Sequence, residues 1–241
     1  MMKKQIIYKE LAAYYDLIYY WKDYAAEVKK LTKIIRKYRK SRGKELLDVA
    51  CGTGEHLKFL AEDFFCTGVD INQGALQIAQ KKIKMAVFKK ADMLSFSLKK
   101  EFDVITCLFS AIGYLKTHAN LKKAIFNFAC HLKKGGVLIV EPWLSKAVYR
   151  SGNAHLNTYD GKDIKIARMV VSKRVRNLSI MDMHYLIAEK DKTVRHYVDR
   201  HEMGLFDMDK ILAYFVKAGL KTEFVKDGFT GERGMVVATK P

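Results

Sequence analysis

The stretch ELLDVACGTG, residues 45–54, joins an apolar strand pattern to a glycine-rich turn. Leucine and valine side chains favour a buried strand over residues 45–49. In the turn that follows, Gly52 and Gly54 permit positive φ and let the backbone approach a ligand closely. Apolar residues recur at roughly helical spacing over 55–64, so the turn opens a helix whose free N–H groups face the bound molecule. This order predicts a pocket for a nucleotide-type cofactor.

Two common nucleotide motifs do not match the turn. A dinucleotide fingerprint needs a third glycine three residues after Gly54, and that position is Leu57. A phosphate-binding P-loop needs G-x-x-x-x-G-K-[ST], and the chain contains no such run. The sequence therefore disfavours both NAD and a P-loop nucleotide.

Four features in chain order resemble the class I S-adenosylmethionine-dependent methyltransferases. The run D-x-A-C-G-T-G resembles their motif I, Asp70 ends a second strand, and Asp92 and Met93 follow a third short strand. Residues 101–115, EFDVITCLFSAIGYL, look like the family's fourth strand and the loop after it. The resemblance implies S-adenosylmethionine as cofactor, with an acid at Asp70 for both ribose hydroxyls and an acid near the adenine amine at Asp92. The cofactor-binding residues so expected are Asp48, Ala50, Gly52, Gly54, Asp70, Ile71, Asp92, Met93 and Phe109.

Each of these residues also has an ordinary structural interpretation. Asp70 and Asp92 are also compatible with plain strand ends, Asp48 with a role in orienting the loop, and Met93 with core packing. Cys51 fits a small loop residue better than a nucleophile, because no Cys–His arrangement supplies a base. The order of the four features favours the cofactor interpretation.

Composition indicates one folded enzyme. The chain has 241 residues, 49% of them hydrophobic, which is enough to bury one substantial core with a small appended subdomain. Its four cysteines lack C-x-x-C spacing, and the odd spacing of His196 and His201 sends them to opposite faces of a strand, so no metal site is expected. Neither a signal peptide nor about 18 uninterrupted apolar residues is found, which predicts a cytoplasmic protein without a membrane partner.

Charge favours an anionic partner without selecting one. The net charge is +18, from 44 Lys and Arg against 26 Asp and Glu. Many lysines form pairs that are spread along the chain, as solvated helix and strand ends usually are, and no RNA-binding module signature is present. A nucleotide diphosphate or a nucleic acid would each be attracted, and the former is favoured.

Strands alternate with helices through most of the chain, which predicts a parallel, doubly wound α/β sheet of Rossmann-like form. The expected helices are about 8–40, 55–64, 74–82, 118–131 and 207–218, and the expected strands are 45–49, 66–70, 86–88, 102–107, 136–141, 220–226 and 233–239. Segments 162–174, 178–189 and 193–204 predict an inserted antiparallel β subdomain. We therefore expect a helical lid over 1–40, a cofactor-binding core over 41–143 and 205–241, and a substrate-binding insertion over 144–204.

A narrower resemblance spans nearly the whole chain. It is similar to the dTDP-amino-hexose N,N-dimethyltransferases of deoxysugar biosynthesis. The matching runs are YYDLIYYWKDYAAEV from Tyr14, DVACGTGEHL from Asp48, FSAIGYLKT from Phe109, HLKKGGVLIVEPW from His131, MDMHYLIAE from Met181 and GERGMVV from Gly231. Departures from the family pattern occur at Leu144, at Gly231-Glu232-Arg233-Gly234 and over 144–160. The resemblance implies N-methylation of a nucleotide-linked amino sugar.

Methyl transfer from a sulfonium requires the acceptor lone pair to lie in line behind the S–CH3 bond, in a site that excludes water. A sugar amine needs only to be neutral, so a dedicated base is optional. The resemblance implies Tyr8, Tyr15, Tyr114 and Arg233 around the methyl-transfer site. Some relatives have histidine at the position of Tyr114, which argues against a strong general base there.

For the acceptor, Arg168 and Arg174 are candidates to meet a diphosphate, since guanidinium suits bidentate contact. His184 is a candidate to line the substrate cleft. A solvated sheet face and an ordinary strand histidine are the competing interpretations of these residues.

Two other functions stay open at this point: a methyltransferase acting on RNA or protein, and a non-catalytic S-adenosylmethionine-binding module. Aromatic residues near the N-terminus and in the insertion suit a small enclosed acceptor better than a polymer. The sequence leaves open the sugar, the number of methyl groups added, and whether the protein is a homodimer.

Overall fold

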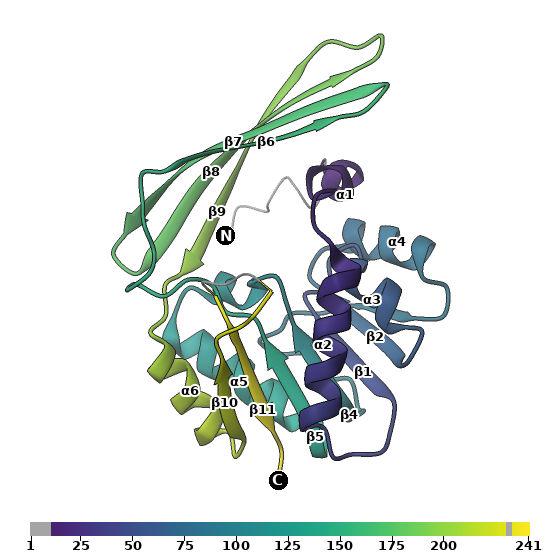
Figure 1. The fold of residues 1–241 in the computed structure, drawn as a ribbon, viewed down its shortest axis with the longest axis vertical. Helices are drawn as coiled ribbons and strands as arrows, with labels where there is room; N and C mark the ends of the chain where they lie inside the picture. The colour runs from purple at the N-terminus through teal and green to yellow at the C-terminus, as the bar shows by residue number, and fades with distance from the viewer. Residues whose placement is uncertain (1–10, 230–232) are drawn as a thin grey trace.

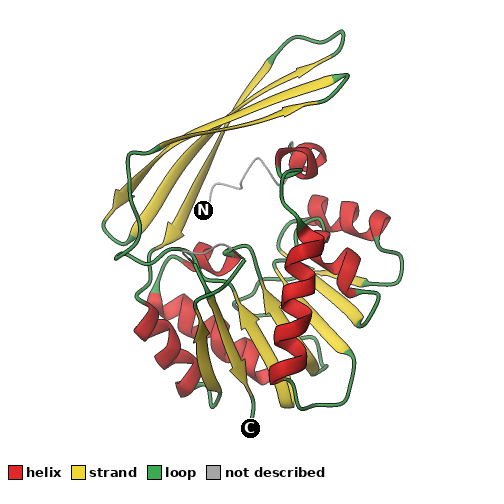
Figure 2. Ribbon diagram, viewed as in Figure 1, coloured by secondary structure: helices red, strands yellow, loops and turns green. Residues whose placement is uncertain are grey.

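The computed structural model describes residues 11–229 and 233–241, which form two β-sheets with helices around the larger one (Figures 1 and 2). The larger sheet has seven strands in the order β10-β11-β5-β4-β1-β2-β3. The smaller sheet has four strands in the order β6-β7-β8-β9. This arrangement confirms the expected α/β class with a Rossmann-like sheet and an additional antiparallel sheet.

The seven-stranded sheet has a parallel part and an antiparallel edge. Strands β1 Glu45–Val49, β2 Phe65–Asp70, β3 Val87–Lys90, β4 Phe102–Cys107 and β5 Leu132–Val140 run parallel, whereas β11 Met235–Thr239 is antiparallel to both β5 and β10 Lys221–Val225. The chain moves from β1 outward to β3 and then returns to β4 on the other side of β1. In open α/β sheets ligands bind in the crevice at such a reversal, outside the carboxyl ends of the strands.

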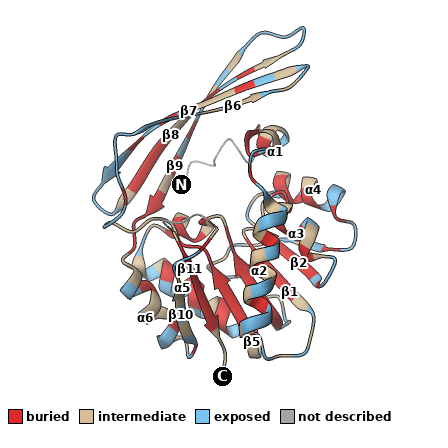
Figure 3. Cartoon of the chain, in the orientation of Figure 1, coloured by how far each residue is buried: buried red, intermediate tan, exposed pale blue. Residues whose placement is uncertain are grey.

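Helices cover both faces of this sheet. The helices are α1 Tyr15–Ile18, α2 Tyr24–Tyr38, α3 Glu55–Leu60, α4 Gln73–Lys82, α5 His118–Cys130 and α6 Met208–Lys217, with single 3-10 turns η2 Ala12–Tyr14 and η3 Ala111–Leu115. One core cluster joins α5 and α6 to the sheet, as Phe128 and Phe215 illustrate, and another joins α2 and α3 through Leu31 and Leu57. The central strands are buried on both faces (Figure 3).

The four-stranded sheet is an antiparallel meander of β6 Ala154–Asp160, β7 Ile164–Val175, β8 Leu178–Glu189 and β9 Arg195–Gly204. One of its faces packs on the N-terminal segment, where Tyr185 and Ile166 join Tyr15 and Tyr19 in a buried cluster. Near the loops of the larger sheet, Met203 and Met181 pack with residues that include Tyr114 and Trp143. The antiparallel sheet thus faces the carboxyl-end loops of the larger sheet (Figure 1).

Two expectations about the elements were wrong. The single helix expected over about 8–40 is interrupted, because α1 ends at Ile18 and α2 begins only at Tyr24, where the Asp23 side chain accepts a hydrogen bond from Ala26 N at 2.9 Å. Strand β6 was not expected, because its polar sequence AHLNTYD has no clear alternation and it pairs only with β7 at a sheet edge. The remaining elements lie within a few residues of their expected bounds, the largest differences being the start of β5 at Leu132 and the end of α3 at Leu60.

Within the described residues, no helix is long and apolar enough to cross a membrane. The same part of the chain contains no group of three or more His, Cys, Asp or Glu side chains placed to hold a metal ion.

The buried carboxylate of Asp103 ties the edge of β1 to β4 and β5. Its oxygens accept hydrogen bonds from Gly43 N at 3.1 Å, from Glu45 N at 3.0 Å and from Lys133 Nζ at 2.8 Å. Asp103 is 1% exposed. Removal of the charge leaves these donors with a weaker acceptor.

We therefore expect Asp103→Asn to lower the free energy of unfolding by about 1–3 kcal/mol. Urea unfolding at pH 7 should show a lower midpoint with an unchanged slope. The control is Asp63→Asn, because Asp63 is exposed and, among the described residues, its carboxylate forms only a long ion pair of 3.9 Å with Arg36. Equal midpoints for the wild type and the Asp103 variant would contradict this account.

Candidate functional site

The loop between β1 and α3 is a tight turn with an open side. Ala50, Gly52 and Gly54 all have positive φ, at 59°, 55° and 82°. A Cβ atom built on Gly52 would meet no atom of the described residues within 4 Å. The turn therefore leaves room for a ligand directly against its backbone.

Asp70 at the end of β2 is fixed to this turn. Its Oδ2 accepts a hydrogen bond from Gly52 N at 2.9 Å, and its Oδ1 accepts one from Asn72 N at 2.8 Å. Burial raises the pKa of this carboxyl, and its backbone N–H donors partly oppose that rise. The next residue, Ile71, is 58% exposed. An acid and an exposed apolar side chain thus lie next to each other at the crevice.

Three further expected residues flank the crevice at different depths. Asp92 is exposed and accepts a hydrogen bond from Leu94 N at 2.9 Å, and Met93 packs partly against the core. Asp48 is 3% exposed, accepts a hydrogen bond from Thr106 Oγ1 at 2.7 Å, and has its pKa raised to about 6 by burial. Asp48 therefore lies beneath the loop, while Asp92 lies at the surface.

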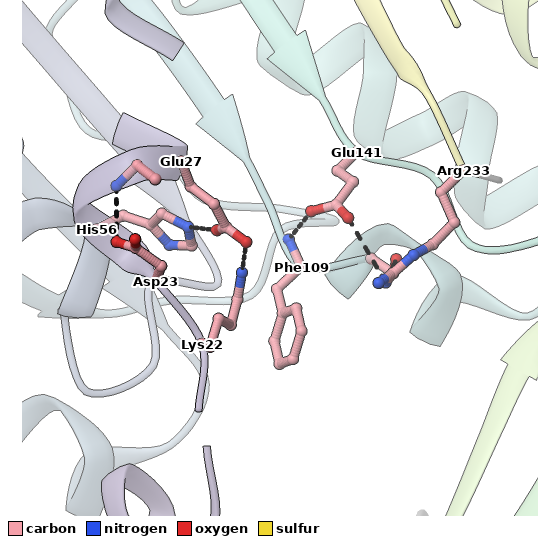
Figure 4. Close-up of polar contacts among 9 residues, drawn as sticks. Lys22, Asp23, Glu27, His56, Phe109, Glu141 and Arg233 are labelled. Atoms are coloured by element: carbon pink, nitrogen blue, oxygen red, sulfur yellow. Dashed lines mark hydrogen bonds and ion pairs between the residues drawn. The ribbon is translucent and has the colours of Figure 1, made fainter. Parts of the chain in front are cut away.

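A buried carboxylate, Glu141, joins three segments that are far apart in sequence (Figure 4). Its Oε2 accepts a hydrogen bond from Phe109 N at 2.7 Å, and its Oε1 lies 3.5 Å from Arg233 Nη1. The same guanidinium nitrogen donates to Ser110 Oγ at 2.8 Å, and the Arg233 side chain lies over the Trp143 ring. Burial raises the pKa of Glu141, an effect that Arg233 opposes. The loops after β4 and β5 and the start of β11 are held together here.

The N-terminal segment crosses the turn between β1 and α3. Thr53 Oγ1 donates to Asp16 Oδ1 at 2.8 Å, and Lys82 Nζ lies 2.5 Å from Asp16 Oδ2. The Tyr19 ring meets the Phe109 ring edge-on, with centroids 5.2 Å apart. Residues 11–23 therefore cover the crevice from the side of the turn.

A buried ion cluster anchors the start of α2 beneath this segment (Figure 4). Glu27 forms ion pairs with Lys22 and with His56, whose Nε2 lies 2.8 Å from Glu27 Oε2. Lys22 Nζ also lies 4.9 Å from the centre of the Phe109 ring. Burial alone would raise the pKa of Glu27, but hydrogen bonds from His56 and Lys22 hold it below its ordinary value.

On the side of the antiparallel sheet, the Tyr114 hydroxyl lies 2.7 Å from His201 Nδ1. His201 Nε2 lies 3.1 Å from Asp199 Oδ2. Position 114, in the loop after β4, is a tyrosine and not a histidine. A histidine nevertheless reaches this place from β9, because His201 lies 87 positions later in the sequence. The motif analysis missed this pair, although the i, i+2 spacing of Asp199 and His201 places both on one face of a strand.

The structure separates the candidate acceptor residues. Arg168 lies on the inner face of β7, with its guanidinium 5.1 Å from the centre of the Tyr19 ring. Arg174 is exposed near the end of β7 and donates to Arg176 O. His184 is exposed on the opposite face, where its ring stacks on His196, because neighbours on a strand alternate and Tyr185 points inward. The expectation that His184 lines the inner cleft does not fit this placement.

The candidate methyl-transfer residues come together only in part. Tyr15 is buried in the aromatic cluster under the antiparallel sheet, while Tyr114 and Arg233 lie in the loops described above. Tyr8 lies outside the described residues. Sequence reasoning also missed Lys22 and the residues that hold the loops together. The available signal for Lys22 was its position as a charged residue within the aromatic run YYDLIYYWKDY.

Comparison with known proteins identifies the family. A methyltransferase domain model matches residues 46–136. The dTDP-3-amino-3,4,6-trideoxy-alpha-D-glucopyranose N,N-dimethyltransferase of Streptomyces venezuelae is 38% identical over 92% of this chain and 94% of its own length. The dTDP-3-amino-3,6-dideoxy-alpha-D-glucopyranose N,N-dimethyltransferase of Streptomyces fradiae is 35% identical over 94% of this chain and 89% of its own length. This chain belongs to the class I S-adenosylmethionine-dependent methyltransferases.

Solved structures agree with the sequence relationship. The crystal structure of DesVI from Streptomyces venezuelae matches with a TM-score of 0.90 and 35% identity, over 95% of this chain and 98% of that one. The S-adenosylmethionine-bound structure of CalS10, an amino pentose methyltransferase from Micromonospora echinaspora, matches with a TM-score of 0.83 and 29% identity, over 91% and 92%. This methyltransferase is an enzyme whose cofactor is S-adenosylmethionine.

The ion cluster around Glu27 generates a stability prediction for this methyltransferase. We expect Glu27→Gln to destabilise the fold by about 1.5–3 kcal/mol, because buried Lys22 and His56 lose a charged acceptor. For a chain of this size such a loss corresponds to a melting temperature lower by roughly 3–12 °C. Thermal unfolding followed by circular dichroism, with exposed Glu62→Gln as control, measures it.

The pH dependence of this difference has a defined sign. Because the pKa of Glu27 is depressed in the folded state, its contribution is present above the unfolded pKa of about 4.3 and is lost as pH falls through the folded value. The difference in melting temperature between wild type and variant should therefore shrink below about pH 4. A difference that stays constant from pH 7 to pH 3.5 would rule out this origin.

Proposed function

We propose that this methyltransferase transfers methyl groups to the amine of a nucleotide-linked amino sugar. The observation that carries the proposal is Arg168 on the inner face of β7, whose Nε atom is buried without a hydrogen-bond partner among the described residues. A buried, unsatisfied donor is costly unless a ligand supplies an acceptor. The relatives named above act on dTDP-linked amino sugars, whose diphosphates are such acceptors.

The crevice between β1, β2 and β4 fits the cofactor. In this proposal the backbone of Ala50, Gly52 and Gly54 lies against its amino-acid and ribose parts, and Asp70 accepts the ribose hydroxyls. Exposed Ile71 and half-buried Met93 contact the adenine ring, and Asp92 receives its amine. Asp48 supports the turn from beneath, and Phe109 closes the side toward the acceptor. Bound S-adenosylmethionine supplies the sulfonium methyl group.

We expect Asp70→Ala to weaken S-adenosylmethionine binding by about 1–3 kcal/mol, because the ribose hydroxyls lose a charged acceptor. Calorimetric titration of the cofactor measures the change, with Asp63→Ala as a control on an exposed aspartate. Because Asp70 also holds Gly52 N, the melting temperature of both variants is measured first. Unchanged affinity in a folded Asp70 variant would reject the assignment.

For the acceptor, Arg168 is the candidate phosphate ligand that the structure supports best. It is partly buried between Tyr19 and Asn157, which holds the guanidinium in place, whereas Arg174 on the same face is exposed six residues further along β7. A planar guanidinium that is already positioned loses little freedom on binding a diphosphate. We infer that residues 11–23 cover the site and that 144–204 hold the acceptor.

Arg168→Glu should raise the KM for the nucleotide-linked acceptor by at least tenfold, since a repulsive charge replaces the phosphate ligand. Cofactor affinity should stay unchanged, because the two ligands occupy separate subsites. Arg174→Glu makes the same charge reversal at the exposed position and should change KM much less. An equal KM for wild type and Arg168→Glu would eliminate the proposed contact.

Methyl transfer in this site depends mainly on alignment. Burial raises the pKa of Tyr15 well above its ordinary value, with Tyr19, Tyr24, Tyr114 and Asp70 adding to the rise, so Tyr15 remains a neutral phenol. It can orient the acceptor by hydrogen bonding but does not serve as a base at neutral pH. Arg233 acts through the loop that it shares with Glu141.

Parallel assays of labelled methyl transfer test the proposed acceptor. Labelled S-adenosylmethionine is offered with a dTDP-linked amino sugar, with bulk tRNA and with peptides. Incorporation into the sugar nucleotide alone, at its nitrogen, is expected. Incorporation only into tRNA or peptide would replace this function with a polymer methyltransferase, and incorporation into none would favour a binding module.

A further inference from the structure

A buried tyrosine, histidine and aspartate form a chain that starts in η3 and ends on β9. His201 is 3% exposed and Asp199 is 2% exposed, and both lie on the face of β9 that packs against η3. The distances along the chain are 2.7 Å from Tyr114 Oη to His201 Nδ1 and 3.1 Å from His201 Nε2 to Asp199 Oδ2. The motif analysis did not assign any function to Asp199 or His201.

The order of these groups sets the direction of the Tyr114–His201 hydrogen bond. The Asp199 carboxylate lies 3.1 Å from His201 Nε2 as an ion-pair partner, so it favours the tautomer with the ring proton on Nε2. His201 Nδ1 then has a lone pair that faces the Tyr114 hydroxyl, which donates to it. Tyr114 can therefore pass its proton to His201 while its own oxygen takes a proton from another donor. The resulting imidazolium is stabilised by Asp199.

Tyr114 lies on the acceptor side of the site. The Tyr15 ring lies 4.8 Å from the Tyr19 ring, and the Tyr19 ring meets that of Phe109, in the loop that leads into η3, at 5.2 Å between centroids. Tyr114 also packs in one cluster with Trp143 and Met183, where the loop after β5 meets the antiparallel sheet. The ammonium group of an acceptor bound in front of the transferred methyl group would therefore meet the phenol oxygen of Tyr114.

Near neutral pH, an amine acceptor that binds as an ammonium ion must lose a proton before it can attack. A sugar amine is largely an ammonium ion near neutral pH and then has no lone pair to attack. Each methyl transfer forms an N–C bond from the amine lone pair, breaks the S–CH3 bond and leaves its electron pair on sulfur. The product is again an ammonium ion, so a second transfer to the same nitrogen needs a second deprotonation.

We propose that Tyr114, His201 and Asp199 form the path by which the acceptor ammonium loses its proton before each methyl transfer. The ammonium proton goes to the Tyr114 oxygen, and the Tyr114 proton goes to His201 Nδ1, where Asp199 stabilises the imidazolium. The proton returns through Tyr114 to water when the methylated product leaves and the site opens. Tyr114 is the group that touches the acceptor, while His201 and Asp199 act through it as positioning residues. This inference rests on the proposed amine acceptor.

Other charged or titratable groups face this chain from the neighbouring elements. They are Tyr15 and Tyr19 from the N-terminal segment, Arg168 from β7, Tyr185 from β8 and Arg233 near β11. Burial raises the pKa of all three tyrosines, so they remain neutral phenols through pH 9. A change in the methyl-transfer rate between pH 6.5 and 9 therefore reports on Tyr114, His201 and Asp199 and on the acceptor amine.

The test measures single-turnover methyl transfer by the full chain, with saturating S-adenosylmethionine and dTDP-linked amino sugar, from pH 6.5 to 9.5. At pH 7, His201→Gln and Tyr114→Phe should each be slower than wild type by roughly 10- to 100-fold. Near pH 9.5 both should recover to within about threefold, because the amine then arrives neutral. The control is His196→Gln, whose residue stacks on His184 on the outer face of the same sheet.

The double variant should be no slower than the slower single variant, because both residues belong to one path. A loss that is equal at every pH, or wild-type rates at pH 7 in folded variants, would overturn the proton path. Tyr114→Phe removes one oxygen only, so it decides the question if His201→Gln fails to fold. A wild-type enzyme that methylates no amino sugar would overturn the proposed acceptor, and the proton path with it.

Discussion

The site depends on the buried carboxylate of Glu141. Phe109 N donates to one of its oxygens, and the Arg233 guanidinium approaches the other, so the loop after β4, the end of β5 and the start of β11 share one charge. Such a group stabilises only when its partners are in place, since an unpaired buried charge is costly. The backbone of Phe109 and Ser110, with positive φ at both residues, is held in a conformation that these contacts support.

In our proposal this junction lies between the cofactor and the acceptor. The turn after β1 and the end of β2 form one side, where Asp70 and Gly52 are bonded to each other. The inner face of the antiparallel sheet forms the other, with Arg168 and His201 on β7 and β9. Residues 11–23 bridge the two sides, because Asp16 bonds to Thr53 in the turn and Tyr19 contacts Arg168 on β7. In our proposal the methyl group passes between these sides in a site that excludes water.

Sequence patterns predicted those parts that depend on local chemistry. The glycine turn at 52–54 and the alternation of strands and helices predicted the sheet and a nucleotide-type cofactor pocket, because φ preference and side-chain periodicity act over a few residues. The identity of the cofactor came from the resemblance to the methyltransferases. They could not predict that His201 meets Tyr114, since that contact depends on how β9 packs against η3. They also misplaced His184, because the face of a strand that is buried is decided by tertiary packing.

The central claim is that an amine on a nucleotide-linked sugar is held between these two sides. A crystal structure of the full chain with S-adenosylhomocysteine and a dTDP-linked amino sugar tests it most directly. We expect the amine nitrogen near Tyr114 Oη, in line with the position of the transferred methyl group, and the diphosphate at Arg168. A sugar nucleotide bound elsewhere, with its amine pointing away from the cofactor sulfur, would contradict the account.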